Sequence, residues 1–374
     1  MKTFKTCFSA VFMALLILPG IFMNRKEGAV SESEKRKLAE KPQLYAEDGS
    51  PNRNFTADFE TYFNDRIGFR DRMVMTNAQV QYYVFGQIDR GGIYNLGPHG
   101  ELNYVGGKVL KDYTRTNLPD EAELLAAEKA FGNLTDYMKE QGAVCFYLQC
   151  WDKHSIYPEQ FSQHVKQYEP VSMTDRYEEV LLRNPDLHVI ETKEKLLDAK
   201  DDFEVYTVWG DPAHWSRRGA RIAYRAAMEK INEVTGGNYR ILTDEDYDLT
   251  YVDTGMTIFN AIHRPCMEPA YTLRAPEAVR SEEKLKIPDD SRNVRFTNDA
   301  AGNDTTLLIM GDSYINSYLI NDFAESFGTT ILIWGDHIKD MRTIMETYHP
   351  DIVLFENAER VPRFKMVQNT FGEK

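Results

Sequence analysis

Two short polar segments contain the residue types that acyl transfer requires. The segment GDPAHWS contains Asp211 and His214, and the segment GDSYINS contains Ser313. A serine hydroxyl becomes a nucleophile when an imidazole takes its proton and a carboxylate orients that imidazole. We therefore expect Ser313 to be a nucleophile, His214 its general base and Asp211 the orienting acid. Each also has a purely structural interpretation, as a helix N-cap, a packing residue beside Trp215 and a turn cap, respectively.

The serine segment follows an uncharged run at residues 305–310. This run predicts a buried strand, and a helix is expected to begin at Ser313. A serine at that position lies at the carboxyl end of the strand, where the first N–H groups of the helix lack partners and can hold an oxyanion. For this role we consider the backbone N–H of Tyr314 and the side-chain amide of Asn316.

The segments around these residues alternate between two patterns, uncharged runs of strand length and longer stretches with helical periodicity. The strand-like runs are 143–148, 187–190, 305–310, 330–334 and 351–355, with a further possible strand at 203–208; the helix-like stretches are 121–139, 221–234, 323–327 and 338–348. Uncharged strands separated by helices predict a parallel sheet covered on both faces, an α/β sandwich. Such a sheet gathers its chemistry at the carboxyl ends of its strands, so both polar segments are expected at one edge.

The amino terminus contains an export signal. Lys2 and Lys5 precede an apolar run at residues 8–23, and two further basic residues follow it. No small-residue cleavage motif follows the run, so a retained signal-anchor and a cleaved signal peptide both remain open for residues 1–27. The rest of the protein is expected outside the cytoplasm, anchored to the cell membrane, in the periplasm or at the cell surface.

Residues 28–110 predict a smaller region ahead of the sheet. Its charged start, 28–41, is expected to be a solvated stalk that holds the rest of the chain off the membrane. An amphipathic helix within 54–87 is expected to pack on the main domain, and a hairpin follows at 93–105. Residues 111–374 are assigned to the α/β domain.

Composition argues against several other classes of protein. A net charge of −14 leaves no basic face large enough for nucleic acid. No glycine-rich phosphate loop precedes a helix, and His337 and His349 lack metal-ligand spacing, so neither a cofactor nor a metal is expected. Cys145 and Cys150 would point to opposite faces of a strand; one disulfide through Cys266 and three free thiols both remain open.

Together, the two polar segments resemble the SGNH hydrolase superfamily, whose members share a flavodoxin-like α/β/α sandwich. In most members the serine comes first, whereas here Asp211 and His214 precede Ser313. This permuted order is similar to the alginate O-acetyltransferase branch (AlgX/AlgJ-like) and to the related DHHW proteins of Firmicutes. That branch usually has its acid two residues before the histidine, where this sequence has Pro212. Asp211 matches the spacing of the wider superfamily instead, and Pro212 restricts the turn.

Further segments resemble the same branch, in the same order along the chain. They are EKRKLAEKPQL with FTADFETYFNDRIGFRDRMV, the hairpin IYNLGPHGELNYV, the strand CFYLQCWDKHSIYPEQF with Lys153, Tyr157, Pro158 and Glu159, and the closing strand YHPDIVLFENAER with Glu359 and Arg360.

The resemblance implies O-acetyl transfer to an exported cell-surface polysaccharide through the Ser-His-Asp site, without a cofactor or metal. The expected partners are a polysaccharide acceptor, a membrane-bound acyltransferase that donates acetyl groups, and the membrane through the N-terminal segment, but no nucleic acid. One alternative is a carbohydrate esterase (deacetylase) with the same triad. The other is a catalytically silent polysaccharide-binding or assembly protein, which Pro212 at the usual acid position favours.

Overall fold

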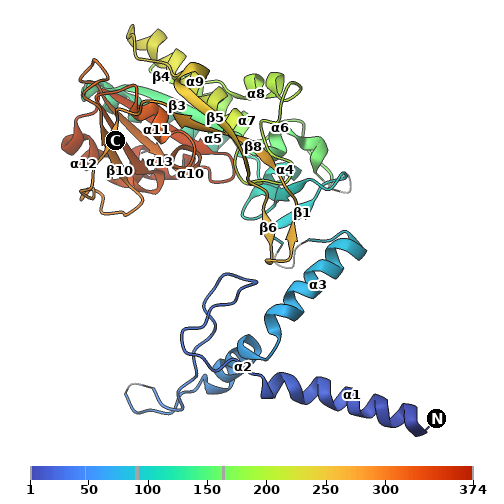
Figure 1. Ribbon diagram of the computed structural model, residues 1–374. Helices are drawn as coiled ribbons and strands as arrows, with labels where there is room; N and C mark the ends of the chain where they lie inside the picture. The colour runs from blue at the N-terminus through green and yellow to red at the C-terminus, as the bar shows by residue number, and fades with distance from the viewer. Residues whose placement is uncertain (1, 47, 89–91, 162–164, 373–374) are drawn as a thin grey trace. The chain divides into compact units, whose positions relative to one another are not determined.

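The computed structural model describes residues 2–46, 48–88, 92–161 and 165–372 (Figure 1). The chain forms two compact units. Met1–Asp89 and Met256–Arg264 make the N-terminal unit, and Arg90–Gly255 and Pro265–Lys374 make the sheet unit. The hairpin that we expected in the smaller region therefore belongs to the sheet unit.

The amphipathic stretch of the N-terminal unit forms two helices, where we expected one. The elements of this unit are α1 (Lys2–Ile21), α2 (Phe55–Arg66), α3 (Arg70–Phe85), β6 (Thr257–Ile258) and β7 (Ile262–His263). The break between α2 and α3 contains Gly68, where a Cβ atom would lie 2.7 Å from the Cβ of Phe22. The chain therefore packs closely against Phe22 at the point where it turns from α2 to α3.

The segment that we expected to be a solvated stalk is folded. Ser31 and Ser33 are buried, and both hydroxyls donate to Asp71 Oδ1 of α3, at 2.6 and 2.7 Å. Arg36 donates to both carboxylate oxygens of Asp65 in α2, at 2.7 and 2.6 Å. The expectation was wrong because the polar residues of this segment pair with acids of α2 and α3, which composition alone does not reveal.

The sheet unit is built on a mostly parallel sheet of seven strands among the described residues, as the alternating pattern predicts. The first five strands in spatial order are parallel to one another, and the last two add antiparallel pairs at one edge. In that order, the strands are β4 (Leu187–Ile190), β3 (Val144–Cys150), β13 (Ile352–Ala358), β11 (Thr306–Gly311), β12 (Thr329–Trp334), β10 (Val294–Thr297) and β9 (Val279–Arg280).

Helices cover both faces of this sheet, so alternate strand residues enter two different cores. One core includes α5 (Glu121–Glu140), α7 (Met173–Leu181), α12 (Met341–Tyr348) and α13 (Phe364–Phe371); the other includes α9 (Arg217–Thr235) and α11 (Ile320–Ala324). Cys145 lies in the first core and Cys150 in the second, as their spacing predicts. Both thiols and that of Cys266 are free.

The remaining elements are short and complete the sheet unit. They are β1 (Tyr94–Leu96) and β2 (Leu102–Tyr104), which form the expected hairpin, β5 (Tyr247–Asp253) and β8 (Met267–Leu273), which form an antiparallel pair that we did not predict, and the helices α4 (Val109–Thr114), α6 (Lys153–Ile156), α8 (Lys193–Ala199) and α10 (Ser313–Asn316).

The possible strand at 203–208 does not form. The backbone there is held by isolated hydrogen bonds: Val205 N–H donates to the hydroxyl of Tyr157, and Val208 O accepts from the N–H of Leu102 at 2.8 Å. These contacts satisfy the backbone without a ladder, which an apolar run alone cannot distinguish from a strand.

The start of α9 follows this irregular segment directly. Ser216 is its N-cap: the hydroxyl accepts from the N–H of Gly219 at 3.1 Å and donates to Glu204 O at 2.7 Å. A Cβ atom on Gly219 would lie 2.4 Å from the carbonyl oxygen of Val205. The helix therefore approaches the irregular backbone as closely as only glycine permits.

This close approach predicts that Gly219→Ala destabilises the protein by about 1–3 kcal/mol, the usual cost of overpacking. The measurement is chemical denaturation of both variants beside the wild type. Gly132→Ala is the matched control, because Gly132 also lies within a helix and its added Cβ would meet nothing within 4 Å. The control should be neutral or more stable by about 0.5–1 kcal/mol. Equal stability of the two variants would contradict the packing argument.

Candidate active site

The structure brings Ser313, His214 and Asp211 together at the carboxyl edge of the parallel sheet. Ser313 Oγ lies 2.7 Å from His214 Nε2, and His214 Nδ1 lies 2.8 Å from Asp211 Oδ2. Ser313 follows the end of β11 after one residue, Asp312, whereas the other two side chains come from the turn before α9. This is the order of contacts through which an imidazole can take a serine proton while a carboxylate holds its other nitrogen.

The carboxylate of Asp211 reaches the imidazole although Pro212 follows it. Its Oδ1 accepts the N–H of Ala213 at 2.9 Å, which closes a tight turn, and its Oδ2 accepts the hydroxyl of Tyr318 at 3.3 Å as well as facing His214. Burial alone would raise the pKa of Asp211, but these hydrogen bonds outweigh burial and lower its pKa below the ordinary value. The group is therefore held as a carboxylate. Tyr318 was not found by sequence reasoning, since no motif contains it.

The backbone around Ser313 differs from what we expected for an oxyanion site. Helix α10 has only four residues, and the N–H of Tyr314 donates to Asp312 Oδ1 at 3.0 Å. The side chain of Asn316 is exposed to solvent, and the backbone N–H of Asn316 donates to Asp312 O. In the described part of the chain, the N–H of Ser313 has no acceptor. Of these backbone N–H groups, that of Ser313 alone is available to a ligand.

A buried guanidinium lies beside the histidine. Arg360 Nη2 is 3.4 Å from His214 Nε2, while its Nη1 donates to the hydroxyl of Tyr314 at 2.9 Å and to the carboxylate of Asp152. Burial opposes the charge, but the Asp152 carboxylate and the Tyr314 oxygen outweigh it and raise the pKa of Arg360. A fixed positive charge therefore adjoins the nitrogen that faces Ser313. The sequence pointed to Arg360 only through the closing-strand resemblance.

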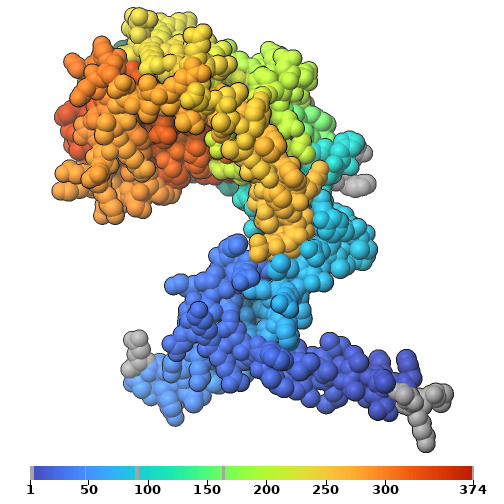
Figure 2. Space-filling model, viewed as in Figure 1, coloured from blue at the N-terminus to red at the C-terminus, as the bar shows by residue number. Residues whose placement is uncertain are grey.

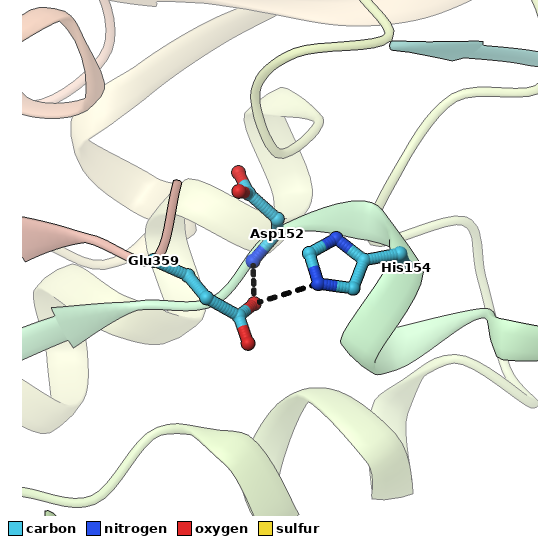
Figure 3. Close-up of side chains that lie close together, drawn as sticks. All are labelled: Asp152, His154 and Glu359. Atoms are coloured by element: carbon cyan, nitrogen blue, oxygen red, sulfur yellow. Dashed lines mark hydrogen bonds and ion pairs between the residues drawn. The ribbon is translucent and has the colours of Figure 1, made fainter. Parts of the chain in front are cut away.

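The segments that carry Asp152 and Arg360 are joined by a further acid, Glu359 (Figure 3). Its Oε2 accepts the N–H of Asp152 at 2.8 Å and lies 3.7 Å from His154 Nε2, and its Oε1 accepts the hydroxyl of Ser155 at 2.7 Å. Asp152, His154 and Glu359 offer ligand atoms within 4.8 Å of one another, so they are the residues whose spacing could suit a metal. In Figure 3 the carboxylate of Asp152 points away from the other two. This carboxylate contacts Arg360 and Tyr314. The contacts of Glu359 and Asp152 instead indicate a buried support for the guanidinium of Arg360.

A buried ammonium holds the segment that leads to His214. Lys153 Nζ donates to Leu102 O at 3.0 Å and to Thr207 O at 2.9 Å. Burial lowers the pKa of Lys153 to about 8. This cation ties the irregular backbone before the histidine turn to β2, and so helps to position the imidazole.

Residues 110–321 match the family model described as "SGNH hydrolase-like domain, acetyltransferase AlgX". The match covers more than half of the chain, so the protein belongs to this family of SGNH-like O-acetyltransferases. The resemblance inferred from the two polar segments is thereby confirmed, and the family suggests an enzyme. No curated protein sequence matches the chain.

Several solved structures are similar to much of this chain. Bacillus cereus PatB1 with a sulfonyl adduct is 16% identical, with a TM-score of 0.55 over 73% of this chain and 96% of PatB1. A DHHW family protein from Eubacterium siraeum is 14% identical, with a TM-score of 0.49 over 77% of this chain and 98% of its own. The O-acetyltransferase domain of Pseudomonas putida AlgJ is 11% identical, with a TM-score of 0.49 over 74% and 98%. The likeness to PatB1 agrees with an SGNH-like α/β fold.

A buried acid beneath the serine turn gives a pH-dependent prediction. Glu356 accepts the N–H of Asp312 at 2.7 Å, and burial, followed by the Asp312 carboxylate, raises the pKa of Glu356 well above its ordinary value of 4.5. The folded protein keeps this proton where the unfolded chain releases it, so this group makes the wild type less stable as the pH rises above that value.

Glutamine mimics the neutral acid at every pH, so Glu356→Gln should gain stability relative to the wild type as the pH rises above the ordinary value of 4.5. The gain is at most about 1.4 kcal/mol per pH unit. Urea denaturation at several pH values measures it. If the stability difference between the two proteins stays constant with pH, or if the wild type gains stability relative to the variant as the pH rises, Glu356 is ionised in the fold.

Proposed function

We propose that the protein transfers an acetyl group through Ser313 to a hydroxyl of an exported cell-surface polysaccharide. The observation that carries this proposal is the contact of 2.7 Å between Ser313 Oγ and His214 Nε2, in a chain of an O-acetyltransferase family. The contact between His214 and Asp211 supports it, because a carboxylate reaches the imidazole in spite of Pro212. That proline was the feature that favoured a catalytically silent protein.

The proposed reaction has two acyl-transfer steps. In the first, His214 takes the proton of Ser313, Oγ bonds to the carbonyl carbon of an acetyl ester, and the leaving alcohol receives the proton from His214. In the second, a sugar hydroxyl gives its proton to His214 and attacks the acetyl-serine, and Ser313 Oγ then leaves and takes that proton back. Asp211 keeps the imidazole in the tautomer whose Nε2 is free to accept. Water in place of the sugar gives the esterase reaction.

We propose that Arg360 and the N–H of Ser313 stabilise the oxyanion of each tetrahedral intermediate. Tyr314 N–H, our first candidate from sequence, donates to Asp312, and the Asn316 side chain is exposed. The guanidinium instead lies beside the reacting atoms and is fixed by Asp152, so little reorganisation is needed as negative charge develops.

We propose that a hollow lined in part by Tyr318, whose hydroxyl contacts Asp211, takes the sugar acceptor. It has a volume of about 440 Å³, and its lining includes Tyr318, Ser317, Asn321 and Tyr271. Aromatic faces with nearby hydroxyl and amide groups are a common setting for ligand recognition. Tyr318 also donates to Asp211, so the hollow adjoins the catalytic contacts. The proposed acetyl donor is a membrane-bound acyltransferase, as the family resemblance implies. It would supply acetyl groups to this protein outside the cytoplasm.

The nucleophile assignment predicts the behaviour of three variants. Ser313→Ala should lower kcat for a chromogenic acetate ester by at least about a thousandfold and abolish labelling by a fluorophosphonate, and Asp211→Asn should lower kcat by about a thousandfold. Ser291→Ala, at an exposed hydroxyl elsewhere in the sheet unit, is the matched control and should label normally. Adding an oligosaccharide should divert acetyl from free acetate to sugar. Acetate as the sole product supports the esterase, and a wild type inert to ester and probe refutes both.

The oxyanion assignment predicts a change in kcat and not in KM. Arg360→Lys keeps the charge near Asp152 but loses the planar fork of donors, so kcat should fall by about 10²–10³-fold with KM changed far less. Fluorophosphonate labelling and the melting temperature show whether the triad and the fold survive. A rise in KM with unchanged kcat would assign Arg360 to ground-state binding.

A further inference from the structure

The carboxyl end of α1 is built into the N-terminal unit. The N–H of Gly68, between α2 and α3, donates to Pro19 O at 2.8 Å, and the N–H of Asn24 donates to Arg66 O at 2.8 Å. A Cβ atom on Gly68 would lie 2.7–2.8 Å from the side chain and backbone of Phe22. The last turn of α1 and the residues after it therefore pack against the break between α2 and α3 (Figure 1).

A buried arginine depends on this segment. Arg66 is 2% exposed, and its guanidinium donates to Lys26 O at 2.6 Å, to Asn24 O at 3.3 Å and to Ala39 O at 2.6 Å. Cleavage between Phe22 and Lys26 would release Asn24 O, Lys26 O or both from the fold, and the guanidinium would keep only Ala39 O and the Glu40 carboxylate at 3.9 Å. A buried guanidinium that loses part of its hydrogen bonds is unfavourable. The fold thus favours a chain in which α1 is retained.

Helix α1 itself has no covering within the described chain. Residues Phe4–Ile21 form an apolar stretch of 18 residues with a mean hydropathy of 1.9, none of it buried, and the blue helix is bare in the view of Figure 2. At 1.5 Å per residue, such a helix spans about 27 Å, close to the hydrocarbon thickness of a bilayer. The hydrocarbon of a bilayer would cover the exposed apolar surface of α1.

Aromatic and basic side chains lie where the apolar helix ends. The rings of Phe22 and Phe69 are 5.2 Å apart, and both remain about half exposed, at 57% and 45%. Phe69 has a φ of 63°, an unfavourable value for a bulky residue, so the fold bears strain where it places this ring. Both rings line a hollow of about 380 Å³, together with Arg72 and the acids Glu32, Asp65 and Asp71. Aromatic rings and cations at this level match the interface of a phospholipid bilayer.

We propose that α1 is an uncleaved anchor and that the N-terminal unit rests directly on the phospholipid interface through Phe22, Phe69 and Arg72. The occupant of this surface is the bilayer that α1 enters, because Gly68 N–H bonds to the last turn of the same helix. No slack stalk separates the unit from the membrane, since residues 28–41 fold onto α2 and α3. This proposal does not depend on the proposed acyl transfer.

Counting thiols in the full chain tests the retention of α1. The sequence has four cysteines, and Cys7 lies inside α1. Reduced and denatured protein isolated from membranes should take up four maleimide groups and have the intact mass of the uncleaved chain. Three groups, with a new amino terminus beyond Ile21, would overturn the proposal.

Fluorescence in vesicles tests the contact with lipid. Phe22→Trp in the full chain, reconstituted in phosphatidylcholine and phosphatidylglycerol, should add emission that lipids brominated near the headgroup quench by about half. Leu125→Trp is the matched control, because Leu125 is 66% exposed on α5 of the other unit, and its added emission should not change. Equal quenching of the two, or none in Phe22→Trp, contradicts the interfacial position.

Trypsin sensitivity tests the rigid junction. Gly68→Ala places a Cβ against Phe22, so cleavage after Arg25 and Lys26 should be about tenfold faster or more than in the wild type. Gly20→Ala is the control, because its Cβ would meet nothing within 4 Å. Ester hydrolysis should be unchanged in both variants, since Ser313 lies in the sheet unit. Equal cleavage rates would show that the junction is already loose.

Discussion

The buried ammonium of Lys153 is the contact on which the geometry of the candidate site depends. Ser313 is placed by a parallel ladder, since only Asp312 separates it from the end of β11. His214 has no such support, because the segment before its turn joins no strand of the sheet. Lys153 supplies a substitute by donating to Leu102 O and Thr207 O. A cation shared by two carbonyls fixes this irregular backbone, where the repeated hydrogen bonds of a sheet are absent. The imidazole of His214 is thereby held within hydrogen-bond distance of Ser313, which lies on a different segment.

Around the rest of the site, acidic and basic side chains hold one another in place. Glu359 holds the backbone of Asp152, the carboxylate of Asp152 holds Arg360, and the guanidinium faces His214. Each buried ion is costly without its partner, so the set acts as a unit and keeps the cation beside the reacting atoms. This arrangement accounts for an oxyanion stabiliser that is a side chain, in a protein whose serine turn uses the Tyr314 N–H for its own N-cap.

The two units of the chain divide the proposed work. The sheet unit contains the triad and its supports, and its SGNH-like fold agrees with membership in an O-acetyltransferase family. The N-terminal unit contains the apolar helix, and the buried Arg66 of α2 binds main-chain oxygens of the segment that follows this helix. An enzyme that modifies an exported polymer benefits from a short, firm attachment, because this keeps it close to a donor in the membrane.

The sequence by itself determined the strand and helix pattern of the sheet unit and the three residues that meet in its site, because uncharged runs and hydroxyl, imidazole and carboxylate groups are local properties. Locality also explains the errors: residues 203–208 have the composition of a strand but no neighbour to pair with, and 28–41 has the composition of a solvated stalk but finds acids on α2 and α3. Only the tertiary structure decided that Arg360 adjoins His214 and that Tyr314 N–H is occupied. Those outcomes depend on which distant groups share a buried space, and chain order does not specify such distances.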